Sequence, residues 1–289
     1  MLAIILGLTT AVVYGFADFF GALASRRLRP VLVTGLAGWL GLALLVLVAT
    51  SGLMPANFTP PAIFWGILGG LFSAFGLSCL YKALAIGPIS VLSPLGAVVA
   101  GLVPTVVGAT LLGENFSALG WLAIGLVLVA VVLVGFVPGK NVDRPSMTAL
   151  LYGLGAGVGI GAVLICLHNA PTTSGSAAII LVRLTNGLIL GGWAAVLIFR
   201  RKVLPKEFKG LGSKFWLMAL ATGALDATAN VIFVLASRLG TLTVVSVLTS
   251  LYPLGTILLA RVVLKEKLAI SQTVGIALAM GASVLLALN

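Results

Sequence analysis

Long apolar runs alternate with short polar links along the whole chain. A helix that crosses a membrane needs about 20 consecutive, mostly apolar residues, and many of the runs reach this length. We expect transmembrane helices over ten segments: 2–23, 31–50, 62–85, 88–112, 118–137, 147–168, 177–199, 215–237, 241–263 and 270–288.

The links between these segments are too short to hold a soluble domain. Even the longest link, Arg200 to Lys214, is only a basic loop that contains Pro205 and Gly210. The pattern therefore predicts an all-α integral membrane protein with ten transmembrane helices.

A repeat divides the chain at its polar central link, Pro138 to Ser146. Residues of the first half recur at nearly constant spacing in the second: Ala83, Gly87, Ser90, Val91, Leu112 and Glu114 as Ala236, Gly240, Thr243, Val244, Leu264 and Glu266. We expect two five-helix repeats, 1–137 and 147–289. The recurrence of the two glutamates at helix ends indicates shared local structure rather than a binding role.

An odd number of spans in each half means that the second half enters the membrane from the opposite side. Inverted repeats are typical of secondary transporters, in which the substrate site lies between the halves near the membrane midplane. The alternative is a duplicated structural scaffold without transport activity.

Composition excludes a water-soluble protein. Hydrophobic residues make up 61% of the 289 positions and charged residues 8%, against roughly half and a quarter in soluble domains. The 36 glycines are scattered among apolar residues, which indicates close helix contacts.

The net charge of +11 does not indicate a nucleic-acid partner, because the basic residues lie between apolar spans rather than on one polar surface. All 17 Lys and Arg residues except Arg183 and Arg238 flank odd-numbered links. The positive-inside rule then places these links in the cytoplasm and both termini outside.

Several stretches resemble one transporter family. They are YGFADFFGALASRR from Tyr14, YKALAIGPISVLSP from Tyr81, the LLGE that ends at Glu114, and ASRLGTLTVVSVLTSLYP with the LKE that ends at Glu266. The chain resembles an EamA-type member of the drug/metabolite transporter superfamily, and its opening is similar to bacterial members. The resemblance implies a ten-helix carrier of metabolites with both termini inside, opposite to the orientation that the charges predict.

Ionisable groups within membrane spans are costly, so each is a candidate for function. Asp18 and Lys82 lie at similar depth near the same membrane face, because helices rise 1.5 Å per residue. We expect them to form an ion pair between the first and third spans. The pair is interpreted as structural, although Lys82 could instead extend to the interface.

Asp226 lies near the middle of the eighth span. Thr222 and Asn230 lie one turn before and after it, so the three residues form a polar stripe. Arg183 is the cation well inside a span that can neutralise the carboxylate. These residues are either part of a substrate or proton pathway, or a buried contact between helices.

Prolines interrupt the fourth and ninth spans, in corresponding places of the two halves. Pro94, Pro104 and Pro253 each remove a backbone donor, and a freed carbonyl group within a membrane often lines a polar cavity. We place Pro104, Pro253 and the adjacent Tyr252 along the pathway, with kinks that merely fit neighbouring helices as the alternative.

The sequence contains no phosphate-binding loop, nucleophile elbow or paired catalytic carboxylates. Its one histidine, His168, is interpreted as an interfacial residue, and Cys79 and Cys166 as reduced packing residues. We therefore expect neither an enzyme nor a cofactor or metal site.

The leading hypothesis is a secondary transporter that moves a small metabolite or drug-like molecule by alternating access, with proton coupling through Asp226. Its expected partners are the lipid bilayer and the small-molecule substrate, and its expected location is the plasma membrane of a bacterium. A membrane-embedded enzyme, a structural or regulatory membrane protein, and a channel are the alternatives.

Overall fold

The described helices follow the predicted segments closely, except in the ninth segment. The computed structural model describes residues 1–25, 28, 30–52, 54–86, 89–135, 146–201, 210–253, 255–256, 259 and 270–287. The helices are α1 (Leu2–Ser25), α2 (Pro30–Thr50), α3 (Pro60–Ile86), α4 (Ile89–Leu111), α5 (Ala118–Gly135), α6 (Met147–Asn169), the 3-10 turn η1 (Thr172–Ser174), α7 (Ala177–Arg201), α9 (Ser213–Leu239), α10 (Leu242–Thr249) and α12 (Ile270–Ala287).

Proline, serine and threonine define many of the helix starts. Pro30 and Pro60 occupy the first position of α2 and α3. Proline lacks a backbone N–H group, but at this position an N–H group would have no hydrogen-bond partner within the helix. Ser146 and Thr241 cap α6 and α10, and their hydroxyl oxygens accept hydrogen bonds from the N–H groups of Ala149 and Val244. Such caps satisfy donors that the first helical turn leaves free.

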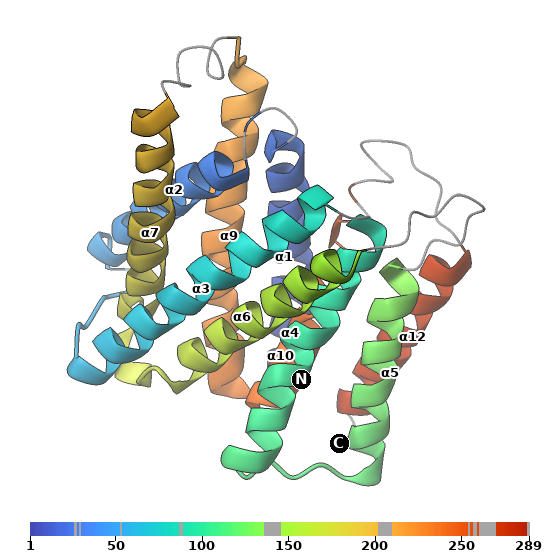
Figure 1. The fold of residues 1–289 in the computed structure, drawn as a ribbon. Helices are drawn as coiled ribbons and strands as arrows, with labels where there is room; N and C mark the ends of the chain where they lie inside the picture. The colour runs from blue at the N-terminus through green and yellow to red at the C-terminus, as the bar shows by residue number, and fades with distance from the viewer. Residues whose placement is uncertain are drawn as a thin grey trace.

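The two halves interlock rather than lie apart. Three contacts between helices of different halves occur twice, once with the halves exchanged. The contact of α1 with α9 corresponds to that of α6 with α3, and the contact of α4 with α6 corresponds to that of α10 with α1. The contact of α3 with α7 corresponds to that of α9 with α2. The remaining major contacts between the halves join α2 to α7, α4 to α10 and α5 to α12. Each contact therefore has a counterpart with the halves exchanged, as expected of a repeat (Figure 1).

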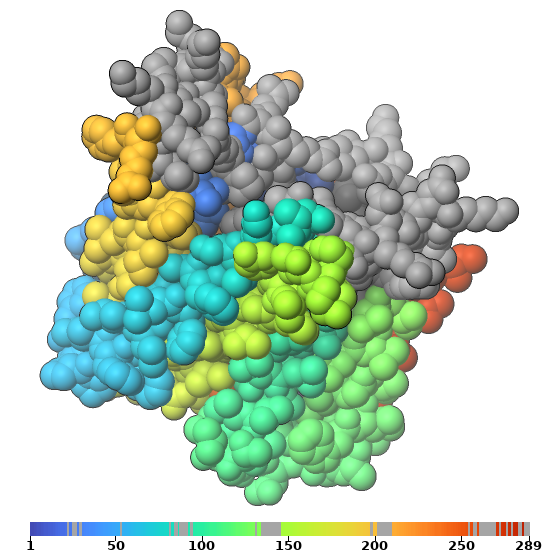
Figure 2. Space-filling view, viewed as in Figure 1, coloured from blue at the N-terminus to red at the C-terminus, as the bar shows by residue number. Residues whose placement is uncertain are grey.

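The described surface carries large apolar side chains. Figure 2 shows that α3, α4, α5 and α6 form one continuous surface, and Phe64, Val106, Leu122 and Leu151 on these helices are all more than half exposed. Such a surface favours contact with lipid over water.

Six helices in the described residues are long and apolar enough to cross a membrane: α1, α2, α3, α6, α7 and α9. Shorter apolar helical segments cover Leu95–Leu111, Ala118–Ala130 and Thr273–Ala282. The total of ten crossings stays a prediction.

The ninth predicted span does not run as one helix through the described residues. Helix α10 ends at Thr249, and Leu251 and Tyr252 donate their N–H groups to the carbonyls of Leu248 and Thr249, at 3.2 and 3.1 Å. These bonds span three residues instead of four, and Pro253 follows without an N–H group. The chain is therefore broken at the place where the proline predicted an interruption.

Two groups of hydrogen bonds join the halves at the end of the molecule that is lowest in Figure 1. The α2–α3 link pairs with the α6–α7 link through a bridge between Ala56 and Gly175, with Asn57 N–H to the Ser174 carbonyl at 3.0 Å and Ser176 N–H to the Pro55 carbonyl at 3.1 Å. Glu114 follows α4, and its carboxylate accepts the N–H groups of Leu242 and Thr243 at 2.7 and 3.1 Å. The first half thus caps a helix of the second.

Replacing Glu114 by alanine should lower the free energy of unfolding by about 2 kcal/mol, because two N–H groups at the start of α10 lose a charged acceptor. Thermal unfolding of the purified protein in detergent measures the change. The neighbouring Asn115→Ala is the control, since the exposed Asn115 side chain bonds only to the Gly113 carbonyl. Equal stability of the two variants would show that the cap contributes little.

The predicted basic links and Glu266 lie largely or wholly outside the described residues.

Candidate functional site

A cavity lies between the two halves, at the level of the break after α10. From the first half it is lined by Tyr14 and Asp18 of α1, Ser73, Leu77 and Leu80 of α3, and Ala100 of α4. From the second half it is lined by Ile160, Val163 and Leu164 of α6, Val182 and Arg183 of α7, Asp226 and Asn230 of α9, and Thr249, Ser250 and Tyr252. A solute in this space would contact both repeats.

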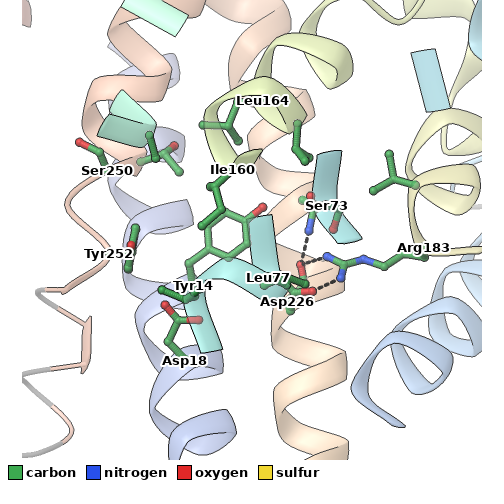
Figure 3. A pocket seen from close by; sticks show the side chains of 16 residues that line it. Tyr14, Asp18, Ser73, Leu77, Ile160, Leu164, Arg183, Asp226, Ser250 and Tyr252 are labelled. Atoms are coloured by element: carbon green, nitrogen blue, oxygen red, sulfur yellow. Dashed lines mark hydrogen bonds and ion pairs between the residues drawn. The ribbon is translucent and has the colours of Figure 1, made fainter. Parts of the chain in front are cut away.

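The cavity is small in this conformation. Its volume is about 80 Å³ when measured by the space open to the centres of water molecules, several times the roughly 10–15 Å³ that one water requires. Polar side chains gather on α1, α7, α9 and the α10 break, whereas α6 supplies only apolar side chains. The cavity is therefore suited to a molecule with one polar and one apolar side (Figure 3).

An ion pair between Arg183 and Asp226 forms one wall of the cavity. The Arg183 guanidinium group contacts the Asp226 carboxylate, and the two side chains are 6% and 29% exposed. Arg183 Nη2 also donates to the main-chain carbonyl of Asp226 at 3.3 Å. The long arginine side chain thus joins α7 to α9.

Asn230 completes this wall. Its Nδ2 donates to the Asp226 carbonyl oxygen at 2.7 Å, so this one oxygen accepts from both Arg183 and Asn230. One turn before the pair, Gly223 of α9 lies against the main chain of Ala37 in α2. Small residues let the backbones approach closely, and this approach fixes the position of α9.

A second buried polar contact joins α7 to α3. Asn186 lies one turn after Arg183, and its Nδ2 donates to the hydroxyl oxygen of the cavity residue Ser73 at 2.6 Å. Asn186 is 1% exposed and Ser73 is 8% exposed. The contact fixes one polar group of the cavity wall and thereby orients α7.

The broken ninth span contributes the opposite wall. Thr249, Ser250 and Tyr252 line the cavity at the turn. Gly15 of α1 packs directly on this turn, and the Thr256 hydroxyl donates to the Gly15 carbonyl at 3.0 Å. Pro253 is buried beside Tyr252, and of these two residues Tyr252 lines the cavity.

Asp18 lies in the cavity, away from Lys82. The Lys82 side chain is exposed, and the described residues contain no ion pair between the two. Asp18 instead faces the same space as Tyr14 and Asp226 (Figure 3). The expected pair failed because similar depth in the membrane does not place two side chains on facing sides of their helices.

Two further predicted pathway residues lie outside the cavity. The Thr222 hydroxyl donates to the Met218 carbonyl of its own helix at 2.8 Å. Pro104 is buried within the continuous helix α4 and packs near Gly161 of α6. In this structure Thr222 therefore bonds within its own helix, and Pro104 lies at the contact between α4 and α6.

Sequence reasoning missed Tyr14, Ser73, Thr249 and Ser250 as cavity residues. Tyr14 and Asp18 are four residues apart, so the stripe rule applied to Asp226 would also have identified them. Ser73, Thr249 and Ser250 gave no such signal, because single hydroxyl groups are common in membrane helices.

The described residues contain no group of three or more His, Cys, Asp or Glu side chains that could hold a metal ion. Cys79 and Cys166 are both buried free thiols.

Comparison with known proteins identifies the two repeats. The model of the EamA-like transporter family matches residues 1–136 and again residues 147–288. A solved crystal structure is similar in fold, with a TM-score of 0.78 and 18% sequence identity over 99% of this chain and 96% of the other. No curated protein gives a significant match.

Proposed function

We propose that this chain, which belongs to the EamA-like transporter family and is a multi-pass integral membrane protein, is a secondary transporter that moves a small molecule by alternating access. The cavity lined by both halves carries this proposal. In alternating access, two repeats rock around a shared site near the midplane. A solute bound here would be exposed to one side and then to the other.

We further propose that Asp226 couples transport to a proton gradient. A carboxyl group in a membrane span can be ionised beside a cation, or neutral after it takes a proton. In the conformation described here Arg183 neutralises Asp226. In a conformation that separates the two side chains, protonation of Asp226 would replace the lost ion pair.

Replacement of Asp226 by asparagine tests this coupling. The variant should be less stable, because it leaves Arg183 without a countercharge, but it should still fold, because the introduced amide retains a side-chain oxygen and the main-chain carbonyl at this position, which already accepts from Arg183, is unchanged. It should lose pH-driven accumulation by at least about tenfold while counterflow continues, since the solute site stays but the protonatable group is gone.

The measurement begins with a comparison of solutes taken up and exported by cells with the intact protein and cells with Asp226→Asn. The solute that differs is then followed in liposomes with and without a pH gradient. Thr222→Val on the same helix is the matched control, because its hydroxyl bonds only within α9. Equal pH-driven accumulation by the intact protein and Asp226→Asn would eliminate the proton role, and absence of counterflow for every solute would eliminate transport.

A further inference from the structure

The cavity contains a carboxyl group that no described cation neutralises. The charged residues in its described lining are Asp18, Arg183 and Asp226. Arg183 and Asp226 neutralise each other through their ion pair. Among the described residues no basic side chain pairs with Asp18, so the ionised cavity has an excess of one negative charge.

This excess charge lies beside aromatic and apolar groups. Tyr14 is one helical turn before Asp18, and both side chains line the same space as the Arg183–Asp226 pair (Figure 3). Leu77, Ile160 and Leu164 supply apolar surface to the same space. An ammonium group near a carboxylate and an aromatic face gains from both, and an alkyl group gains from the apolar wall.

We propose that Asp18 binds the positively charged nitrogen of the substrate, and that the substrate class is organic amines with a short apolar body. This inference rests on the proposed transport function. An anionic solute fits less well, because the cavity arginine is already engaged by Asp226 and the solute would face the free carboxylate. A neutral solute also fits less well, because Asp18 would then stay charged without a partner or would have to take up a proton.

Binding of radiolabelled tetraethylammonium to the purified full chain in detergent tests the proposal. This cation cannot change its own charge, so its affinity reports on the protein. Unlabelled butylammonium should displace it, whereas butyrate and 1-butanol, which have similar size but different charge, should not. Displacement by all three compounds, or no saturable binding of the cation, would contradict a cation site.

Variants assign the site to Asp18. Asp18→Asn should weaken tetraethylammonium binding at least about tenfold, while Asp18→Glu, which keeps the charge, should retain most of the affinity. Lys82→Gln is the matched control at an exposed position and should leave affinity unchanged, because Lys82 does not neutralise Asp18. Size-exclusion chromatography and thermal unfolding check that each variant is folded.

Unchanged affinity in a folded Asp18→Asn variant would overturn the proposal, as would tighter binding in Lys82→Gln. The counterflow assay in liposomes is independent of this measurement. Counterflow without an Asp18-dependent cation site would reject the substrate class alone, and a cation site without counterflow would reject the transport function.

Discussion

Replacing Arg183 by methionine should lower the free energy of unfolding by about 3 kcal/mol, because removal of one partner leaves the other charge buried and unpaired. Arg183 is almost fully buried, and Asp226 is less than one third exposed. The carboxylate also loses a partner that no other described basic residue replaces. We therefore expect this substitution to be among the most destabilising single changes in α7.

The double variant Arg183→Met with Asp226→Leu removes both charges. It therefore separates the destabilisation caused by one unpaired charge from the contribution of the ion pair to the free energy of unfolding. It should recover most of the lost stability, since apolar residues that replace a buried ion pair often cost little. Thermal unfolding in lipid nanodiscs gives the comparison. Leu188→Ala, at a 58% exposed position of the same helix, is the control. A double variant less stable than Arg183→Met would mean that the pair itself stabilises the fold.

Replacing Gly15 by alanine should prevent normal packing of α1 against the broken ninth span. An added methyl group would collide with the Tyr252 carbonyl oxygen and lie 2.6 Å from Gly255 Cα and 2.7 Å from Thr256 N. All three are main-chain atoms, which cannot rotate away, so the helix must move or fail to pack. We expect loss of the monodisperse folded protein, or a large drop in the temperature of unfolding.

Gly125→Ala in α5 is the control for Gly15→Ala. No atom lies within 4 Å of the position that its methyl group would take, so the added group has free space. This variant should elute and unfold like the unchanged protein. Similar behaviour of the two alanine variants in size-exclusion chromatography and thermal unfolding would rule out tight packing at Gly15.

Helix positions were predictable because each depends on a local signal. Apolar runs, Pro60 and Ser146 mark helix starts, and Pro253 marks the break after α10. These signals act over a few residues and are readable from one chain. The start of α6, for example, agrees with its predicted segment to the residue.

Contacts between side chains of different helices were only partly predictable from the sequence. Arg183 and Asp226 were identified as a pair because few charges lie well inside spans and opposite charges must be neutralised there. The partner expected for Asp18 was wrong for this conformation, since the direction of a side chain depends on the rotation of its helix. That rotation is set by contacts such as Gly15 against the α10 break and Gly76 against Gly159, which involve residues far apart in sequence.

Under the mechanism that we propose, the hydrogen bonds at one end of the molecule would have a kinetic consequence. For the halves to separate there, Glu114 has to release the N–H groups of Leu242 and Thr243, and the links around Ala56 and Gly175 have to part. Because these groups lie at helix ends or in links, water can replace each lost partner. In the alternating access that we propose, these contacts would have to break and re-form in every cycle, so their strength would limit the rate of transport without changing the affinity of the central cavity.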